Sequence, residues 1–243
     1  MIALGCDQAH VWYAFPDRIA DAALVARYQA LLNAEERTRH DRLAMARPRR
    51  EHLVTRALCR TTLSRYADVA PQQWQFTCNP HGRPEISGPP ETPPLRFNLS
   101  HCAGLIACVV TCAVDAGIDV EDLDRPGETV RVADRYFSPQ EVADLRALPP
   151  AQQRVRFFEY WTLKESYIKA RGLGLAIPLD QFTFHLAPGR PVTISFGPRI
   201  ADDPRLWQFR RYRPSARHLM AVAIRRGHGA DLAVDLRETV PLR

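Results

Sequence analysis

Lysine is scarce in this sequence of 243 residues. Of its 33 basic side chains 31 are arginine, and the only lysines are Lys164 and Lys169, five positions apart. This scarcity argues against reading the pair as part of an ordinary lysine-rich surface. Lysine is a compact charge whose pKa can be tuned, whereas arginine is planar and always charged, so we expect a chemical reason for retaining both lysines.

Other absences exclude whole classes of protein. The six cysteines form no C-x-x-C motif and are not spaced with histidines as in zinc sites. The common zinc sites are therefore excluded, and we expect reduced thiols. The longest stretch without charge, 97–114, is interrupted by polar residues, so we expect no transmembrane helix. No basic or long apolar segment precedes Cys6, so we expect a mature N-terminus and a cytoplasmic protein. No repeat has a solenoid period.

The composition is that of a globular protein with a full core. Hydrophobic residues make up 46% and charged residues 25%, with a net charge of +6. The length fits one large domain or two halves of about 120 residues. The positive surplus favours a polyanionic ligand or an acidic partner.

Hydrophobic periodicity predicts a mixed α/β (α+β) chain. Helical spacing covers 21–32, and Asn33 is a suitable N-cap for the next helix. Further helices are predicted over 49–66, 127–146 with a break at Ser138-Pro139, and 151–171, ending at Gly172. Strands are predicted at 11–15, 74–76, 95–100, 104–113, 115–121, 182–186, 192–196, 206–212 and 218–224, and the proline-rich run 84–94 is predicted to be an extended loop.

Asp119 and Glu121 are two positions apart in a predicted strand, so both carboxylates project from one face. The neighbouring residues Ile118 and Val120 are typical of a buried strand, where two carboxylates require a cation or hydrogen-bond donors. The pattern D-x-E is common, and a solvated pair of acids at a strand end is the alternative.

The longest predicted helix carries a second set of polar residues. Trp161, Glu165 and Lys169 are spaced four apart and lie along one stripe, with Lys164 beside them. An ordinary helical Glu–Lys pair is the alternative. Upstream, Ser100 and His101 end a predicted strand and are good phosphate donors, although the dipeptide taken alone fits a structural histidine at a strand terminus better.

In this order the motifs resemble those of the Sfp-type 4′-phosphopantetheinyl transferases. The family's G-[KR]-P, F-N-x-S-H, G-I-D-x-E, F-F-S-x-x-E and W-x-x-K-E-x-x-x-K-x-x-G-x-G-L patterns are all present. They correspond to 82–84, 97–101, 117–121, 136–141 and 161–175. Tyr136 replaces a phenylalanine of the family pattern, and Arg83 stands where several members have lysine.

The resemblance implies two pseudo-twofold halves, 1–113 and 114–243, with coenzyme A and Mg²⁺ in the cleft between them. It implies that a monomer transfers 4′-phosphopantetheine from coenzyme A to a serine of an acidic apo acyl or peptidyl carrier protein and releases 3′,5′-ADP. Neither nucleic acid nor a membrane is expected as a partner. The implied metal ligands are Asp119, Glu121 and Glu165, the implied catalytic residues are Glu165, Lys169 and His101, and the implied coenzyme A contacts are Arg47, Arg83, Ser100, His101, Lys164 and Lys169.

Two other functions share part of this inventory. A metal-dependent nuclease also uses a D-x-E pair followed by an acid and a lysine. In that nuclease pattern the last acid and the lysine are two positions apart on one strand, whereas Glu165 and Lys169 are four positions apart on a predicted helix. A basic nucleic-acid-binding module would need interleaved aromatics or a recognition helix, and here arginine is spread over the whole chain.

Overall fold

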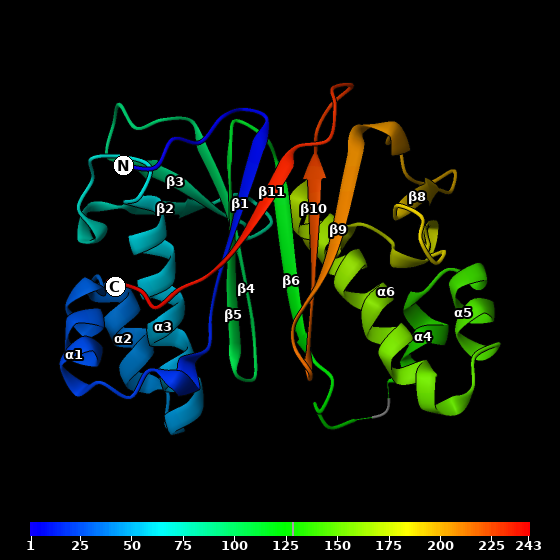
Figure 1. Ribbon diagram of the computed structural model, residues 1–243, viewed down its shortest axis with the longest axis horizontal. Helices are drawn as coiled ribbons and strands as arrows, with labels where there is room; N and C mark the ends of the chain where they lie inside the picture. Colours follow the sequence, from blue (N-terminus) through cyan, green and yellow to red (C-terminus); the bar gives the residue numbers. More distant parts are fainter. Residues whose placement is uncertain (128) are drawn as a thin grey trace.

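The computed structural model describes residues 1–127 and 129–243, and in them one order of elements occurs twice: a strand, three α-helices, a two-stranded hairpin and two further strands (Figure 1). The first set is β1 (Gln8–Ala14), α1 (Ala22–Leu31), α2 (Ala34–Arg42), α3 (Ala46–Leu63), β2 (Gln75–Cys78), β3 (Pro84–Gly88), β4 (Leu95–Cys102) and β5 (Leu105–Cys112). The second set is β6 (Ala116–Asp122), α4 (Val130–Tyr136), α5 (Pro139–Arg146), α6 (Pro150–Arg171), β7 (Phe182–His185), β8 (Thr193–Phe196), β9 (Trp207–Ser215) and β10 (His218–Arg225). A last strand, β11 (Ala233–Glu238), follows.

Sheet topology repeats in the same way. The first half contributes the strand order β1-β5-β4 and the second the order β6-β10-β9, with antiparallel neighbours in both. Helices α1–α3 flank the strands on one side of the molecule and α4–α6 flank them on the other (Figure 1). The predicted α/β fold with two pseudo-twofold halves is confirmed.

Helix ends follow the predicted local signals. Asn33 caps α2 and Ser138 caps α5, each in a capping box with a glutamate three residues on. Gly172 ends α6 in the left-handed conformation, with φ 63°. Gly172 sets where α6 stops, and therefore where its last two turns lie against the strands.

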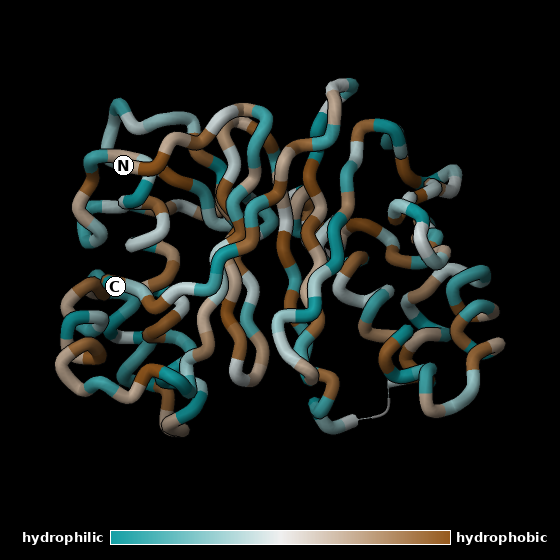
Figure 2. The backbone as a smooth tube through the Cα atoms, viewed as in Figure 1, coloured by the Kyte–Doolittle hydropathy of each residue, from teal (hydrophilic) through white to brown (hydrophobic). Residues whose placement is uncertain are grey.

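Three apolar clusters form the core. One lies between α1–α3 and the first sheet, and a second lies between α4–α6 and the second sheet. The third joins strands of both halves and includes Val11, Val109, Ile118 and Val222. The central strands accordingly carry much of the hydrophobic colour in Figure 2. Because this third cluster is shared, the two halves are packed together as one body.

Two expectations about the chain's course were wrong. The run 84–94 is not all loop, because 84–88 forms β3, which pairs with β2. Residues 233–243 were assigned to the second half, but β11 pairs in parallel with β1, and the Tyr28 hydroxyl donates to the carbonyl of Pro241 at 2.8 Å. The end of the chain thus returns to the first half (Figure 1). Among the described residues, no helix combines the length and apolarity that crossing a bilayer requires.

Candidate active site

The two halves meet where β4 lies against β6, and side chains rather than a backbone ladder join these strands. Asn98 Oδ1 accepts a hydrogen bond from the Ile118 amide at 3.0 Å, and Ser100 Oγ accepts one from the Val120 amide at 3.2 Å. The motif F-N-x-S-H is therefore bonded directly to the motif G-I-D-x-E. This contact fixes the floor of a cleft between the halves.

Two cavities open along this seam. The larger, of about 560 Å³, is lined by residues of both halves, among them Arg47, Ser100, His101, Asp119, Glu121 and Lys169. The smaller, of about 250 Å³, is lined by Glu165, the turn 81–84 and the end of α6. Leu99 and Lys169 line both cavities, so Lys169 stands at their junction. The structure thus brings most of the predicted site residues into one cleft.

Asp119, Ser100 and Lys169 form a compact polar cluster in this cleft. Lys169 Nζ lies 2.6 Å from Asp119 Oδ1, and it also donates to Ser100 Oγ at 3.0 Å and to the Ile118 carbonyl at 3.2 Å. Ser100 donates to Asp119 Oδ1 at 3.0 Å. A hydroxyl has one donor and two acceptor positions, and the contacts of Ser100 use all three. Ser100 was predicted to contact a phosphate, but its place in the structure is that of a residue holding Asp119 and Lys169.

Two further acids of the cleft, Glu121 and Glu165, are partly desolvated. Burial, reinforced by the charge of Asp119, raises the pKa of Glu121 to about 7, although Arg125 opposes the shift by bonding both carboxylate oxygens at 2.8 and 3.0 Å. Burial and then Asp119 also raise the pKa of Glu165, against the opposing effect of Lys169. Raised carboxyl pKa values in a cleft are typical of groups that exchange protons or bind cations.

The oxygen atoms at Asp119 and Glu121 fit a hard divalent cation. Asp119 Oδ2 is buried and has no hydrogen-bond partner among the described residues, which is a costly state for an acceptor. Mg²⁺ in proteins is commonly bound by one or two carboxylates together with phosphate oxygens of a substrate, and the cavity beside these two carboxylates has room for such a substrate. In the described part of the chain, however, no three His, Cys, Asp or Glu side chains are grouped closely enough to hold a metal. The predicted triple site with Glu165 is therefore not preassembled in this structure.

Gly117 makes this arrangement possible by letting α6 approach β6. A Cβ atom at position 117 would lie 2.1 Å from the Ser166 carbonyl oxygen and 2.4 Å from the Ala170 amide nitrogen. Both neighbours belong to the helix backbone and cannot yield by a rotamer change. The glycine of G-I-D-x-E is thus needed for the close packing that places Lys169 on Asp119.

Lys164 lies outside the cleft, contrary to the prediction that it contacts coenzyme A. Its side chain is 0% exposed, and Nζ lies 2.7 Å from Glu141 Oε2, whose side chain is also 0% exposed. Nζ also donates to the carbonyls of Leu179 and Phe182 at 2.8 and 2.7 Å. At about 100° per residue, positions 164 and 169 point roughly 140° apart on the helix, so Lys164 faces the core of the second half while Lys169 faces the cleft. The pair also explains Glu141, whose role the motif alone did not indicate.

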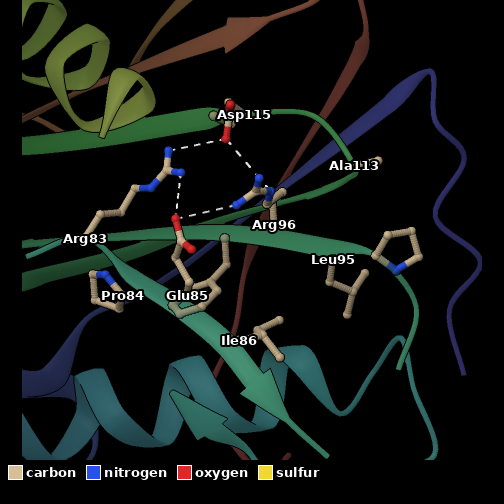
Figure 3. A pocket seen from close by; sticks show the side chains of 11 residues that line it. Arg83, Pro84, Glu85, Ile86, Leu95, Arg96, Ala113 and Asp115 are labelled. Atoms are coloured by element: carbon tan, nitrogen blue, oxygen red, sulfur yellow. Dashed lines mark hydrogen bonds and ion pairs between the residues drawn. The ribbon is translucent and has the colours of Figure 1, made fainter. Parts of the chain in front are cut away.

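Arg83 reaches the smaller cavity, but its charge is already compensated. Its guanidinium bonds Glu85 at 2.9 Å, Asp115 at 3.3 Å and the Ala170 carbonyl at 2.9 Å. Arg96 faces the same two acids, and Figure 3 shows the four charged side chains closing a ring beside a separate pocket of about 340 Å³. This position does not favour the predicted nucleotide-phosphate contact. It makes Arg83 a link between β3, the residue just before β6, and α6.

The remaining predicted residues lie in the larger cavity, together with cations that the sequence did not single out. Arg47 lines the wall and pairs with Glu51 at 3.0 Å, and His101 lies exposed at the same wall. Desolvation by its surroundings lowers the pKa of His101, although Glu51 opposes this. Arg125 and Arg217 also line the cavity. Neither arginine was predicted as a site residue: Arg125 follows a strand, where the helical i, i+4 rule does not apply, and Arg217 is distant in sequence from the other residues of the cleft.

Comparison with known proteins assigns the family. A family model described as "4'-phosphopantetheinyl transferase superfamily" matches residues 115–223, and one described as "4'-phosphopantetheinyl transferase, N-terminal" matches 21–113. The 4'-phosphopantetheinyl transferase HetI of Nostoc sp. is 32% identical over 197 residues, which cover 81% of this chain and 82% of that protein. The chain belongs to the Sfp-type 4′-phosphopantetheinyl transferases.

A second curated relative of this transferase agrees with the assignment. A 4'-phosphopantetheinyl transferase of Bacillus subtilis is 34% identical over 76% of this chain and 80% of its own length. Among solved structures, a holo-(acyl-carrier-protein) synthase from Bacillus anthracis in complex with CoA (3',5'-ADP) has 16% identity and a TM-score of 0.39. That alignment covers 46% of this chain and 95% of that chain.

Proposed function

We propose that this transferase moves the 4′-phosphopantetheine group of coenzyme A onto a serine of an apo carrier protein, with Mg²⁺, and releases 3′,5′-ADP. The observation that carries the proposal is the cluster of Asp119, Ser100 and Lys169 beside a cavity of about 560 Å³. It puts carboxylate oxygens and an ammonium group together on the wall of a space that can hold a pyrophosphate. The two alternatives, a nuclease and a nucleic-acid-binding module, have no comparable support.

Asp119 and Glu121 would hold the Mg²⁺. When bound, that ion neutralises charge on a pyrophosphate and so makes the leaving 3′,5′-ADP a better leaving group. Before that, Lys169 holds Asp119 in place at 2.6 Å, and Arg125 holds Glu121 at 2.8 Å. Preordered ligands reduce the reorganisation that binding requires.

Lys169 and His101 suit the stabilisation of charge on the transferred phosphoryl group. Lys169 stands where the two cavities join, and its three donors now bond Ser100, the Ile118 carbonyl and Asp119, so a contact with a phosphoryl oxygen would replace one of these bonds. His101 has a lowered pKa and is therefore mainly neutral at pH 7, and it can donate one N–H without adding a charge. A compact ammonium and a neutral donor together favour the transition state electrostatically.

Glu165 suits the role of general base. Its raised pKa brings its proton affinity closer to neutrality than that of an exposed glutamate, which favours proton transfer from a serine hydroxyl. It lines the smaller cavity together with Lys169, next to the space assigned to the pyrophosphate. The incoming serine would therefore approach from that side.

We further propose an acidic carrier protein as the partner and a cytoplasmic monomer as the working form. Arg47, Arg125 and Arg217 line the larger cavity, and the chain carries a net charge of +6, which favours an acidic surface around the target serine. Both walls of the cleft come from one chain, so a single copy supplies every proposed residue. Light scattering of the purified protein would test the monomer.

Intact-mass spectrometry of carrier proteins tests the reaction. The protein is incubated with coenzyme A, MgCl₂ and apo carriers from fatty-acid, polyketide and peptide synthesis. We expect at least one carrier to gain the mass of phosphopantetheine, with equimolar 3′,5′-ADP, and its Ser→Ala variant to gain nothing. If none of the carriers gains mass, the proposal is wrong.

A further inference from the structure

Two cysteines that are 106 positions apart in the sequence lie in contact on the surface. The Sγ atoms of Cys6 and Cys112 are 3.4 Å apart. Cys6 is exposed, Cys112 is half-buried, and both thiols are free. A disulfide needs about 2.05 Å between sulfur atoms, so a shift of little more than 1 Å would join them.

Regular structure holds both thiols in place. β1 pairs antiparallel with β5, with Ala9 opposite Thr111, so the chain just before β1 passes the end of β5, where Cys112 lies. Cys6 sits in a turn closed by a hydrogen bond from the Gln8 amide to the Gly5 carbonyl at 3.1 Å. The contact therefore follows from strand register and a bonded turn.

We propose that Cys6 and Cys112 form a reversible disulfide when the protein meets a hydroperoxide. The exposed Cys6 thiol takes one oxygen from H₂O₂, which leaves a sulfenic acid and one water. The Cys112 sulfur then attacks the Cys6 sulfur, forms the S–S bond and displaces that oxygen as a second water. Two thiols lose two electrons and two protons in total, and one H₂O₂ accepts them.

The order of these two steps follows from the environments of the thiols. The hydrogen bond with Cys6, and after it burial, raises the pKa of Cys112. Cys112 is therefore the slower of the two to react with a dissolved oxidant, and it is placed to resolve an oxidised Cys6. Cys78 is also exposed and free, and it provides a control for oxidation that depends on exposure alone.

This modification site is separate from the proposed transfer site. Cys112 pairs with Leu95 at the start of β4, whereas Ser100, five residues further along β4, pairs with Ala107. At about 3.4 Å per residue, the two places are roughly 17 Å apart along the strand. The bond would close a loop that contains β1 to β5, which restricts the unfolded chain and stabilises the fold.

The test is oxidation of the full chain with one equivalent of H₂O₂, followed by thiol counting in denaturant, peptide mapping and thermal unfolding. We expect wild type to lose two of its six thiols, to yield a Cys6–Cys112 peptide and to unfold at a higher temperature, all reversed by dithiothreitol. Cys78→Ser should behave like wild type, whereas Cys6→Ser and Cys112→Ser should show neither the peptide nor the stabilisation.

Either of two results would overturn the proposal. One is a wild-type protein in which Cys78 is oxidised while Cys6 and Cys112 remain free thiols. The other is an oxidation-dependent rise in unfolding temperature that persists in Cys6→Ser. Because none of these readouts uses transferase activity, the outcome is independent of the proposed reaction.

Discussion

Replacing Lys164 with methionine removes a charge around which the core of the second half is built. Nζ of Lys164 meets Glu141 at 2.7 Å and the carbonyls of Leu179 and Phe182 at 2.8 and 2.7 Å. An ammonium group has three donors, and all three are used. Methionine fills a similar length but satisfies none of these oxygens, so the variant leaves a buried carboxylate without its cation.

The expected loss of stability is large because both side chains are fully buried. Removing one partner of a buried ion pair costs about 3–5 kcal/mol, out of a total stability of about 5–15 kcal/mol. For a chain of this size, about 2–4 °C per kcal/mol gives a fall of roughly 6–20 °C in the unfolding midpoint. Adding Glu141→Gln removes the unpaired charge, but the Ser138 and Phe184 amides donate to different oxygens of Glu141 at 2.9 Å each and glutamine offers only one acceptor, so the double variant should recover only part of the loss.

Thermal and urea unfolding followed by circular dichroism measure this cost. Arg146→Met is the matched control, because the Arg146–Asp134 pair is equally close at 2.6 Å but exposed, and its loss should cost less than about 1 kcal/mol. At temperatures where Lys164→Met remains folded, its transfer rate should stay near that of wild type. Unchanged stability combined with lost transfer would refute the structural role and restore Lys164 as a substrate contact.

Three further changes test the packing and the electrostatics. Lys169→Arg should slow transfer about tenfold or more, because a planar guanidinium cannot reproduce the three contacts of the ammonium. Gly117→Ala should lower stability by about 2–5 kcal/mol, whereas Gly229→Ala, with its nearest atom at 3.6 Å, should be tolerated. His52 lies in α3, and burial lowers its pKa to about 4. The unfolded chain therefore takes up a proton at this residue more readily than the folded chain does, and the free energy of unfolding should fall as the pH drops from about 6.5 toward 4. With a discount for the partial exposure of His52, the expected fall is about 1–2 kcal/mol.

Each of these expectations has a result that contradicts it. A wild-type rate in Lys169→Arg would make charge alone sufficient at that position. Equal urea unfolding midpoints for Gly117→Ala and Gly229→Ala would show that α6 can move away from β6 without loss of stability. Urea unfolding at pH 7.5 and at pH 5 measures the stability that wild type and His52→Phe lose on acidification. An equal loss in both proteins would assign the pH dependence to another group.

Local signals in the sequence predicted much of the fold. The capping residues Asn33 and Ser138 and the stop at Gly172 mark helix ends through their own backbone bonds, which depend on few neighbours. β11 was missed because its place is decided by a partner more than 200 positions away, and a short alternating segment carries no record of that partner.

The candidate site was predicted unevenly for the same reason. The spacing of Asp119, Glu121 and Lys169 in the sequence predicted which face of the strand or helix each side chain occupies, and the structure places all three in the cleft. The roles of Lys164, Arg83 and Ser100 depend on what each face meets, and spacing does not encode this. Both lysines looked equivalent in the helix motif, yet one meets a buried glutamate and the other an aspartate in the cleft.

The most direct test of the account compares wild type with Asp119→Ala in one transfer assay. Each protein is incubated with coenzyme A, MgCl₂ and the preferred apo carrier, and the modified carrier is measured over time by intact mass, with circular dichroism as the check on folding. We predict at least about a 100-fold loss of rate in a folded Asp119→Ala, because the carboxylate that Lys169 and Ser100 hold is gone. Transfer by that variant at the wild-type rate would contradict the account.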